Sequence, residues 1–493
     1  MAPSRVGHKA VSFQNISKKS EYPGLGYLDF LLIWPETALF PTFQQYSRRS
    51  RTHKVGVGQQ IILFHPLWPL QQIDGDMMEN KWDHFYKKSY EERLKMIAEA
   101  THLSAAQLTL LRQQLNPVSG ELVENNLVDY SLPEGIAVGL VVNGQEHLVP
   151  MVTEEPSVIA AASNGAKLLS AGEGIKCRCS DKLVSGQIIV KGADPDQVTK
   201  FVRDHHQQLI QIANQSHPSI LNYGGGAKRL DVRVLSNQFL SVDLLVDTGE
   251  AMGANIVNTM LEAASNWLSD QLAVETTMAI LTNFADHALV KVTGTVAVSK
   301  LATKSLSGSR VAQKIADASE VAQLDIQRAT THNKGIMNGV DAAVIAFGND
   351  WRAVESAAHA FAARGDSYQG LSKWRVVNDQ LVGQMTLPVP IGFVGGASKV
   401  LPLVGINKQI AQLHNSREEM QVVAAIGLAQ NLAALKALVT EGIQKGHMNL
   451  QLRSLALSNG ATVKELPAVV KQLGTVHNPN SQTVKEILKT IRR

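Results

Sequence analysis

Two short polar segments directly precede stretches of small and apolar residues that have helical spacing. In the first, Thr153-Glu154-Glu155-Pro156-Ser157 leads into residues 158–166. Adjacent carboxylates at a buried junction cannot both ionise cheaply, so one could stay protonated and act as a general acid. An ordinary helix start is the alternative, because proline and acids favour the first turn of a helix.

The second segment, Glu250 to Asn255, precedes residues 256–268. Its small residues would let the backbone approach a pyrophosphate closely, and the helix start would supply N–H groups to bind it. A tightly packed helix entry without a ligand is the alternative.

Two further segments combine cations, amides and acids. Residues 328–339 and 348–352 place Arg328, Lys334, Asn338 and Asp350 around an apolar run. A lysine beside a carboxylate in a closed site can stabilise the oxyanion that forms when hydride adds to a carbonyl, although a structural ion pair has the same composition. Near the end of the chain, His447 follows Gly446. A histidine on a mobile segment could donate a proton late in a reaction, whereas a lone histidine is more often surface or core filler.

Composition and missing motifs exclude several other classes. The 493 residues are 44% hydrophobic and 18% charged with a net charge of +4, which excludes disorder throughout and gives no basic surplus for nucleic acid. The chain lacks the phosphate-loop, zinc-protease, hydrolase-elbow and strand-linked dinucleotide motifs. Two cysteines, Cys177 and Cys179, are too few for a disulfide framework or a metal site and fit the cytoplasm. No run of about 18 apolar residues predicts a membrane span.

The pattern of apolar residues predicts the elements that must position these segments. Residues 1–81 hold ten of the 26 aromatic residues without a sustained period, and we interpret them as a disordered leader or a start-site artefact. Strands at 185–191 and 229–246 around a helical segment predict a small α+β module inserted in a mostly helical chain. The other predicted elements are helices beginning near Tyr90 and Ser104, a hairpin at 139–152 that turns at Asn143-Gly144, long helices after Gly253, strands at 288–298 and 342–347, and a helical tail from Gly442.

Taken together, these segments resemble 3-hydroxy-3-methylglutaryl-coenzyme A reductase of the soluble bacterial class, from about Tyr86 to Arg493. The segments that carry the resemblance occur in the family's order: Glu154 to Ser157, Glu250 to Asn255, Thr331 to Gly339, Gly348 to Arg352, Gly427 to Asn431 and Gly446-His447-Met448. The resemblance implies an α+β fold with a large substrate domain at 82–180 and 285–441, a small inserted nucleotide-binding domain with an antiparallel sheet at 181–284, and a C-terminal helical flap at 442–493.

The same resemblance implies roles for individual residues. Lys334, Glu155, Asp350 and His447 match the family's catalytic residues for two successive hydride transfers. They would stabilise each oxyanion (Lys334, helped by Asp350), protonate the aldehyde oxygen (Glu155, kept neutral by burial) and protonate the departing coenzyme A thiolate (His447). Ser157, Arg328 and Asn338 match substrate-binding positions. The cofactor-side positions are Glu250, Met252, Gly253, Asn255 and Asn283.

Partners and cofactor also follow from the resemblance. We expect 3-hydroxy-3-methylglutaryl-coenzyme A, mevalonate and coenzyme A as ligands, a homodimer or a multiple of dimers with the active site at the interface, and no nucleic acid, membrane or metal. Glu124 to Val128 stands where the family has its dimer motif, and only Glu and Asn agree. The segment Ala213 to Pro218 lacks the acid that would bind the ribose hydroxyls of NADH, so we predict NADPH, with NADH possible. Oxidation of mevalonate with NAD and a silent coenzyme A-binding oligomer are the alternatives.

Overall fold

The computed structural model describes residues 81–396, 400–440, 442 and 452–492. The predicted leader, except for Lys81, and His447 lie outside the described residues. Their predictions therefore stay predictions.

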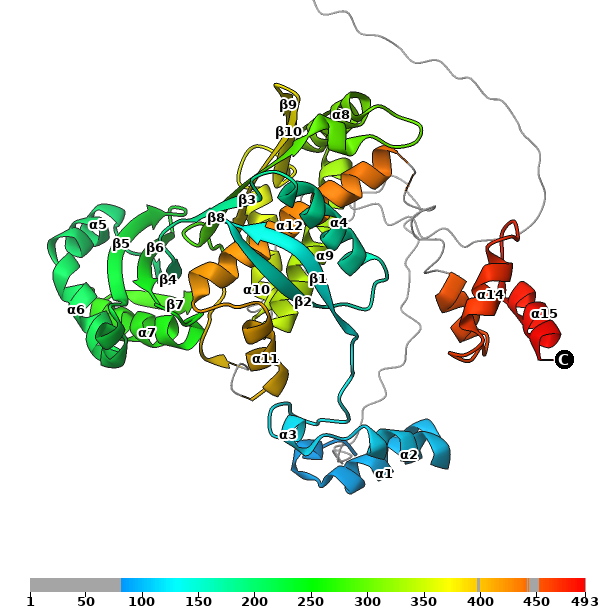
Figure 1. Ribbon diagram of the computed structural model, residues 1–493. Helices are drawn as coiled ribbons and strands as arrows, with labels where there is room; N and C mark the ends of the chain where they lie inside the picture. Colours follow the sequence, from blue (N-terminus) through cyan, green and yellow to red (C-terminus); the bar gives the residue numbers. More distant parts are fainter. Residues whose placement is uncertain (1–80, 397–399, 441, 443–451, 493) are drawn as a thin grey trace, which may run out of the picture. The chain divides into compact units, whose positions relative to one another are not determined.

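Six strands form a mixed sheet in the order β2-β1-β3-β8-β10-β9 (Figure 1). Every neighbouring pair is antiparallel except β1 and β3, which are parallel. The predicted hairpin is confirmed as β1 and β2, and its turn residues Asn143 and Gly144 have φ values of 50° and 90°, the left-handed conformations that a two-residue hairpin turn requires. The strands are β1 (Glu134–Val142), β2 (Gln145–Val152), β3 (Ile175–Cys179), β8 (Leu289–Ala297), β9 (Ser372–Val377) and β10 (Gln380–Pro388).

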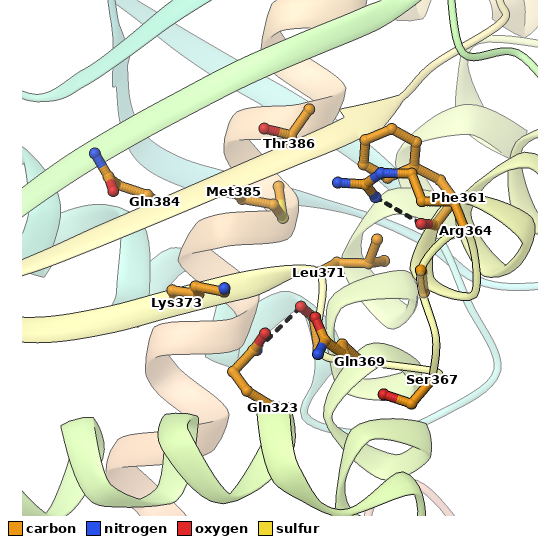
Figure 2. Close-up of a pocket in the computed structure, with 13 residues that line it drawn as sticks. Gln323, Phe361, Arg364, Ser367, Gln369, Leu371, Lys373, Gln384, Met385 and Thr386 are labelled. Atoms are coloured by element: carbon orange, nitrogen blue, oxygen red, sulfur yellow. Dashed lines mark hydrogen bonds between the residues drawn. The ribbon is translucent and has the colours of Figure 1, made fainter.

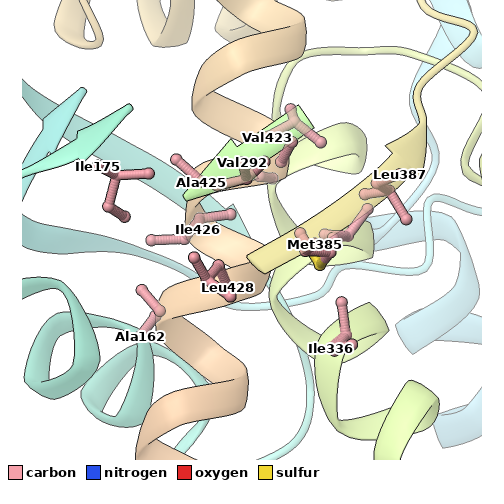
Figure 3. Close-up of a cluster of buried hydrophobic side chains, with 14 of the residues drawn as sticks. Ala162, Ile175, Val292, Ile336, Met385, Leu387, Val423, Ala425, Ile426 and Leu428 are labelled. Atoms are coloured by element: carbon pink, nitrogen blue, oxygen red, sulfur yellow. The ribbon is translucent and has the colours of Figure 1, made fainter. Parts of the chain in front are cut away.

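Helix α12 (Ser416–Val439) lies at the centre of the main hydrophobic core. It is long and apolar enough to cross a membrane, but 72% of its most apolar window is buried inside the protein. A helix that is apolar on all sides fits such an enclosed position. Figure 3 shows its residues Ile426 and Leu428 close to Ile336 and Met385 of other elements. The other helices of this part are α4 (Val158–Ser170), α8 (Gly308–Leu324), α9 (Ile326–Ala346), α10 (Trp351–Ala362) and α11 (Pro402–Ile410).

A second sheet, antiparallel throughout, has the strand order β5-β6-β4-β7 and a hydrophobic core of its own. Its chain segment is inserted between β3 and β8, which are neighbours in the first sheet. The predicted α+β class with an inserted antiparallel module is confirmed by these two sheets, while the exact domain boundaries stay a prediction. The elements are β4 (Leu183–Lys191), α5 (Pro195–Asp204), α6 (His206–Ser216), β5 (Gly226–Val234), β6 (Phe239–Asp247), α7 (Ala254–Leu272) and β7 (Glu275–Leu281).

Short helices occupy both ends of the described chain. At the N-terminal end, Ser89 and Ser104 each cap a helix through a capping box with the residue three positions later, as sequences of this type favour. At the C-terminal end, residues 452–458 are helical, and together with two further helices they bury a small separate core. These helices are α1 (Tyr90–Thr101), α2 (Ala105–Gln113), α3 (Pro117–Gly120), α14 (Leu466–Leu473) and α15 (Ser481–Ile491).

One predicted strand is wrong. Residues 342–347 were expected to form a strand, but they continue α9 to its end at Ala346 and its C-cap at Phe347. The apolar run is continuous because this end of α9 is buried on nearly all sides, including Val340, Ala343 and Val344. A short apolar run of this kind has the same pattern in a buried helix and in a buried strand.

The close contact between α4 and α12 gives a prediction about stability. An ideal Cβ at Gly165 of α4 would lie 1.8 Å from the carbonyl oxygen of Ala429. Gly165→Ala should therefore lower the free energy of unfolding by about 1–3 kcal/mol in a urea titration. Gly405→Ala in α11 is the matched control because nothing lies within 4 Å of its Cβ position, and it should be neutral or stabilising by up to about 1 kcal/mol. Equal stability of the two variants would contradict this packing.

Candidate functional site

A cavity of about 430 Å³ lies between the start of α4, the first half of α9 and the second half of α12. Five of the predicted site residues line it, although they come from two distant segments of the chain. They are Glu155, Ser157, Arg328, Lys334 and Asn338. The structure therefore brings together the segment Thr153 to Ser157 and residues 328–338 of α9.

The central contact of the cavity is an ion pair. The ammonium of Lys334 donates to Oε2 of Glu155 over 2.8 Å. The side chains are 60% and 40% exposed, respectively. The expected pair of buried carboxylates is wrong, because Glu154 is exposed and Glu155 is only partly buried. The partner of Glu155 is a cation rather than a second acid.

Four buried polar atoms of the cavity wall have no hydrogen-bond partner in the protein. They are Ser157 Oγ, Arg328 Nε, His332 Nδ1 and Gln430 Oε1. Buried polar atoms are almost always paired with protein, water or ligand. Their concentration in one cavity is what a site for a polar ligand requires.

Backbone strain marks the same place. Ser157 is the N-cap of α4 with a φ of 77°, in the left-handed region that β-carbon-bearing residues rarely adopt, and its side chain makes no capping bond. An unused hydroxyl on a strained cap is more typical of a binding residue than of a helix start chosen for stability. The ligand-binding interpretation of Ser157 is therefore favoured over the helix-start interpretation.

A buried polar network supports the wall of the cavity. His332 Nε2 lies 2.7 Å from Ser372 Oγ, which donates to Asn431 Oδ1, and Trp374 Nε1 donates to the same oxygen. Burial, reinforced by the nearby charge of Arg328, lowers the pKa of His332 to about 4, so the imidazole is neutral near pH 7. His332 and Gln430 also line the cavity but were not predicted as site residues. The only signal was their position inside the segments Thr331 to Gly339 and Gly427 to Asn431.

Asp350 does not line this cavity. It is the N-cap of α10, where Oδ1 accepts from the backbone N–H groups of Arg352 and Ala353, and its side chain is 39% exposed. The stretch of α9 from Lys334 to Ala346 alone measures about 18 Å at 1.5 Å per residue. The expected hydrogen-bond network between Lys334 and Asp350 is therefore absent within one chain.

The predicted cofactor residues lie at the start of α7 and after β7, outside the cavity of Lys334. Gly253 is the N-cap of α7 with a φ of 94°, and no side chain caps this helix end. The side chain of Glu250 is engaged at one oxygen, which accepts from the backbone N–H of Ser416 at the start of α12 over 2.6 Å. Met252 precedes Gly253, Asn255 is the second residue of α7, and Asn283 follows β7.

Another cavity, of about 330 Å³, contains none of the predicted site residues (Figure 2). Its cation Arg364 is stacked on the ring of Phe361 and donates to the Phe361 carbonyl over 2.6 Å. Among the described residues, no cluster of three or more His, Cys, Asp and Glu side chains could hold a metal ion.

A carboxyl pair between the far half of α9 and α10 makes stability depend on pH. Burial, strengthened by a hydrogen bond that protonated Asp341 donates to Glu355 and by the charge of Glu355, raises the pKa of Asp341 to about 9. Glu355 also contacts His359, which lies 2.7 Å from the hydroxyl of Tyr368, and that hydroxyl accepts from Asn333 beside Lys334. The pair therefore belongs to a polar chain that reaches the helix turn of the lysine.

Asp341 should make the free energy of unfolding fall as pH rises from 5 to 8, since folded Asp341 keeps a proton that the unfolded chain releases above its ordinary pKa of 3.8. His332 opposes this trend below its ordinary pKa of 6.5, because its lowered pKa keeps it neutral in the folded chain, so the contribution of Asp341 is the difference in slope between wild type and Asp341→Asn. Asp341→Asn should remove this contribution, which amounts to at most about 4 kcal/mol for one proton over three pH units. Urea titrations at pH 5 and pH 8 measure it. Asp317→Asn on the exposed face of α8 is the control and should keep the wild-type slope. An unchanged slope in Asp341→Asn would contradict the assignment.

Comparison with known proteins identifies the relatives of this chain. The sequence model of the family described as hydroxymethylglutaryl-coenzyme A reductase matches residues 89–452. The chain is 38% identical over 422 residues to the 3-hydroxy-3-methylglutaryl-coenzyme A reductase of Archaeoglobus fulgidus, covering 84% of this chain and 95% of the relative. It is 30% identical to a probable reductase of the same name from Borreliella burgdorferi, covering 68% and 77%.

Solved structures agree with the sequence relatives. The class II 3-hydroxy-3-methylglutaryl-CoA reductase from Streptococcus pneumoniae, bound to NADPH in open conformations, superimposes with a TM-score of 0.65. That protein is 42% identical and is covered completely, over 82% of this chain.

Proposed function

The chain belongs to the hydroxymethylglutaryl-coenzyme A reductase family of NAD(P)H-dependent oxidoreductases, and we propose that its reaction takes place in the cavity of Lys334 and Glu155. The reaction reduces 3-hydroxy-3-methylglutaryl-coenzyme A to mevalonate and coenzyme A with two NADPH, in the mevalonate pathway of isoprenoid biosynthesis.

The observation that carries this placement is the set of four unpaired buried atoms around the Lys334–Glu155 pair. The substrate's acyl part offers a carboxylate, a hydroxyl and a thioester carbonyl, which are the kinds of partner that such atoms lack. Arg328 suits the carboxylate because a guanidinium can donate two parallel hydrogen bonds. Ser157, Asn338 and Gln430 are then left for the hydroxyl and for orienting the acyl chain.

The ion pair explains how negative charge on the substrate is stabilised. Each reduction turns a carbonyl oxygen into an oxyanion, and the ammonium of Lys334 is a preorganised positive charge for that oxygen. Glu155 holds the ammonium in place at 2.8 Å. It also lines the cavity and is 40% exposed, so it could take up a proton from solvent and then deliver it to the aldehyde oxygen. Protonation of the departing thiolate stays assigned to His447, on the sequence argument alone.

The start of α7 fits a dinucleotide. The uncapped N–H groups behind Gly253 can bind a pyrophosphate. Gly253 itself has a left-handed φ and packs closely against the side chain of Thr248, so a larger residue does not fit there. The bound nucleotide supplies hydride to the substrate carbon. Residues 250–255 and Asn283 would orient it.

We call residues 183–281, which form the second sheet and its helices, the small sheet unit. The charges of this unit support the choice of NADPH. The sequence from His205 to Leu230 contains no Asp or Glu, while His217, Lys228 and Arg229 lie in it. No acid within that stretch repels the 2′-phosphate of NADPH, and Lys228 can pair with it, whereas Arg229 is already paired with Asp231 over 2.8 Å. The Streptococcus pneumoniae relative was solved with NADPH, which agrees with this choice.

Asp350 reaches the chemistry in our proposal from a second subunit. It cannot share hydrogen bonds with Lys334 of its own chain, yet it is exposed beside Trp351, whose large side chain is 45% exposed. A homodimer with two symmetric sites would place Asp350 of each chain at the cavity of the other. Such an enzyme, with two free cysteines and a buried α12, would work in the cytoplasm without a membrane or nucleic-acid partner.

Subunit complementation tests this function and the shared site together. Lys334→Ala and Asp350→Ala should each lower kcat by at least about 100-fold, because each removes stabilisation of the oxyanion. Co-expression of the two variants should restore roughly a quarter of wild-type activity, since half of the dimers are mixed and each mixed dimer has one intact site. NADPH consumption with the thioester substrate measures the recovery.

The matched control is co-expression of Lys334→Ala with Glu155→Ala. These two residues pair within one chain, so each mixed dimer would have two damaged sites and no activity should return. Recovery in this control, or no recovery with Asp350→Ala, would contradict the proposed arrangement.

A further inference from the structure

Three buried charged side chains come from the residue before β4, from α11 and from the first turn of α12, and none of them lines the cavity of Lys334. Lys182, Lys408 and Glu419 are only 5%, 7% and 0% exposed, respectively. Buried charges are unfavourable unless they are paired and hydrogen-bonded. None of the three has a role in the proposed chemistry, so their position calls for another explanation.

Lys182 is hydrogen-bonded to the turn between β6 and α7. Its ammonium donates to the carbonyl oxygens of Gly249 and Ala251 over 2.8 and 2.7 Å. Both acceptors lie in residues 248–253, which overlap the segment proposed to bind the nucleotide and lead into the start of α7; we call residues 248–253 the cofactor loop. Burial lowers the pKa of Lys182 to about 8, against the opposing charges of Glu250 and Asp247. The bond to the two carbonyls is therefore made by an ammonium that little water reaches.

Residues 392–394 hold the same loop from the other side. The backbone N–H of Phe393 donates to the carbonyl of Glu250 over 2.7 Å, and that of Val394 donates to the same oxygen over 3.2 Å. An ideal Cβ at Gly392 would lie 2.2 Å from the backbone nitrogen of Met252. The cofactor loop is thus fixed between an ammonium and a closely apposed backbone.

Further contacts connect this backbone to the segment of Asp350. Lys408 donates to the Phe393 carbonyl over 2.8 Å and lies 3.1 Å from Glu419 Oε2. The other oxygen of Glu419 accepts from the Asn349 amide, whose own oxygen accepts from the Gly392 backbone N–H over 2.9 Å. Asn349 is the residue before Asp350, so one continuous set of contacts joins the cofactor loop to Asp350.

We propose that Lys182 and Glu419 are positioning residues that fix the cofactor loop and the Asn349–Asp350 segment in one register. Lys182 sets the shape of the loop that receives the nucleotide, and Glu419 sets the backbone from which Asp350 projects. This inference rests on the proposed function, because it concerns the nucleotide and the catalytic aspartate. The residues act through the backbone and touch neither substrate nor cofactor.

Lys182→Met tests the first half, since methionine fills a similar volume and leaves the two carbonyls without their donor. The Kd for NADPH, from a fluorescence titration of the full chain, should rise at least about ten-fold, and the KM for NADPH should rise with it. The KM for 3-hydroxy-3-methylglutaryl-coenzyme A should stay within about two-fold of wild type. A Kd for NADPH within about two-fold of wild type would overturn the role of Lys182.

Two controls separate positioning from general damage. Lys176→Met removes an exposed lysine of β3 and should leave NADPH binding unchanged. Val198→Ala removes core volume under the small sheet without touching the cofactor loop, so it should lower the thermal midpoint with little change in the Kd. If Lys182→Met lowers the midpoint and raises both KM values in parallel, as a loosened fold would, the proposal is wrong.

Glu419→Gln tests the role of Glu419 in positioning the Asn349–Asp350 segment. It also provides a separate test of the proposal if Lys182→Met does not fold. Glutamine keeps an acceptor for Asn349 but loses the charge that faces Lys408. Here kcat at saturating substrates should fall at least about ten-fold with an unchanged KM for the thioester, and an unchanged kcat would overturn the role of Glu419. If the wild type binds NADPH but does not consume it with the thioester, the proposed function is wrong. The Kd values of wild type and Lys182→Met for NADPH then still test the role of Lys182.

Discussion

The ion pair between Lys334 and Glu155 is the contact on which the rest of the site depends. The two residues are far apart in sequence and meet because α4, α9 and α12 pack closely. Small residues allow this approach: Gly165 lies against the backbone of Ala429, and Gly339 lies against the side chain of Gln430. The core packing of these helices therefore decides the distance between the ammonium and its carboxylate partner.

The site has two sides that are built differently. Around Lys334 the wall is made of helices whose polar atoms are left unpaired for a ligand, supported by the buried network of His332, Ser372 and Asn431. Around the cofactor loop the polar atoms are paired with each other through Lys182, Lys408 and Glu419. An open cavity and a fixed loop suit a reaction in which the acyl group is held by side chains and the nucleotide by backbone.

Much of this arrangement follows from the sequence, and the failures have physical causes. Turn chemistry identified the hairpin at Asn143-Gly144, and the cap at Ser104 identified the start of α2. The end of α9 was mistaken for a strand because a fully buried helix has no polar face to reveal its period. The partial exposure of Glu155 and its pairing with Lys334 could not be predicted from the adjacent Glu154, because the cation comes from a segment distant in sequence. His332 and Gln430 lay inside identified segments, but only the fold shows which of their neighbours face the cavity.

In the proposed reaction the acyl thioester is reduced fully to an alcohol, by two hydride additions beside the ammonium of Lys334. The most direct measurement is the ratio of NADPH consumed to coenzyme A thiol released by the wild-type protein with 3-hydroxy-3-methylglutaryl-coenzyme A. We expect two NADPH for each thiol, with mevalonate as the product. Thiol release without NADPH consumption, or no thioester-dependent loss of NADPH at all, would contradict it.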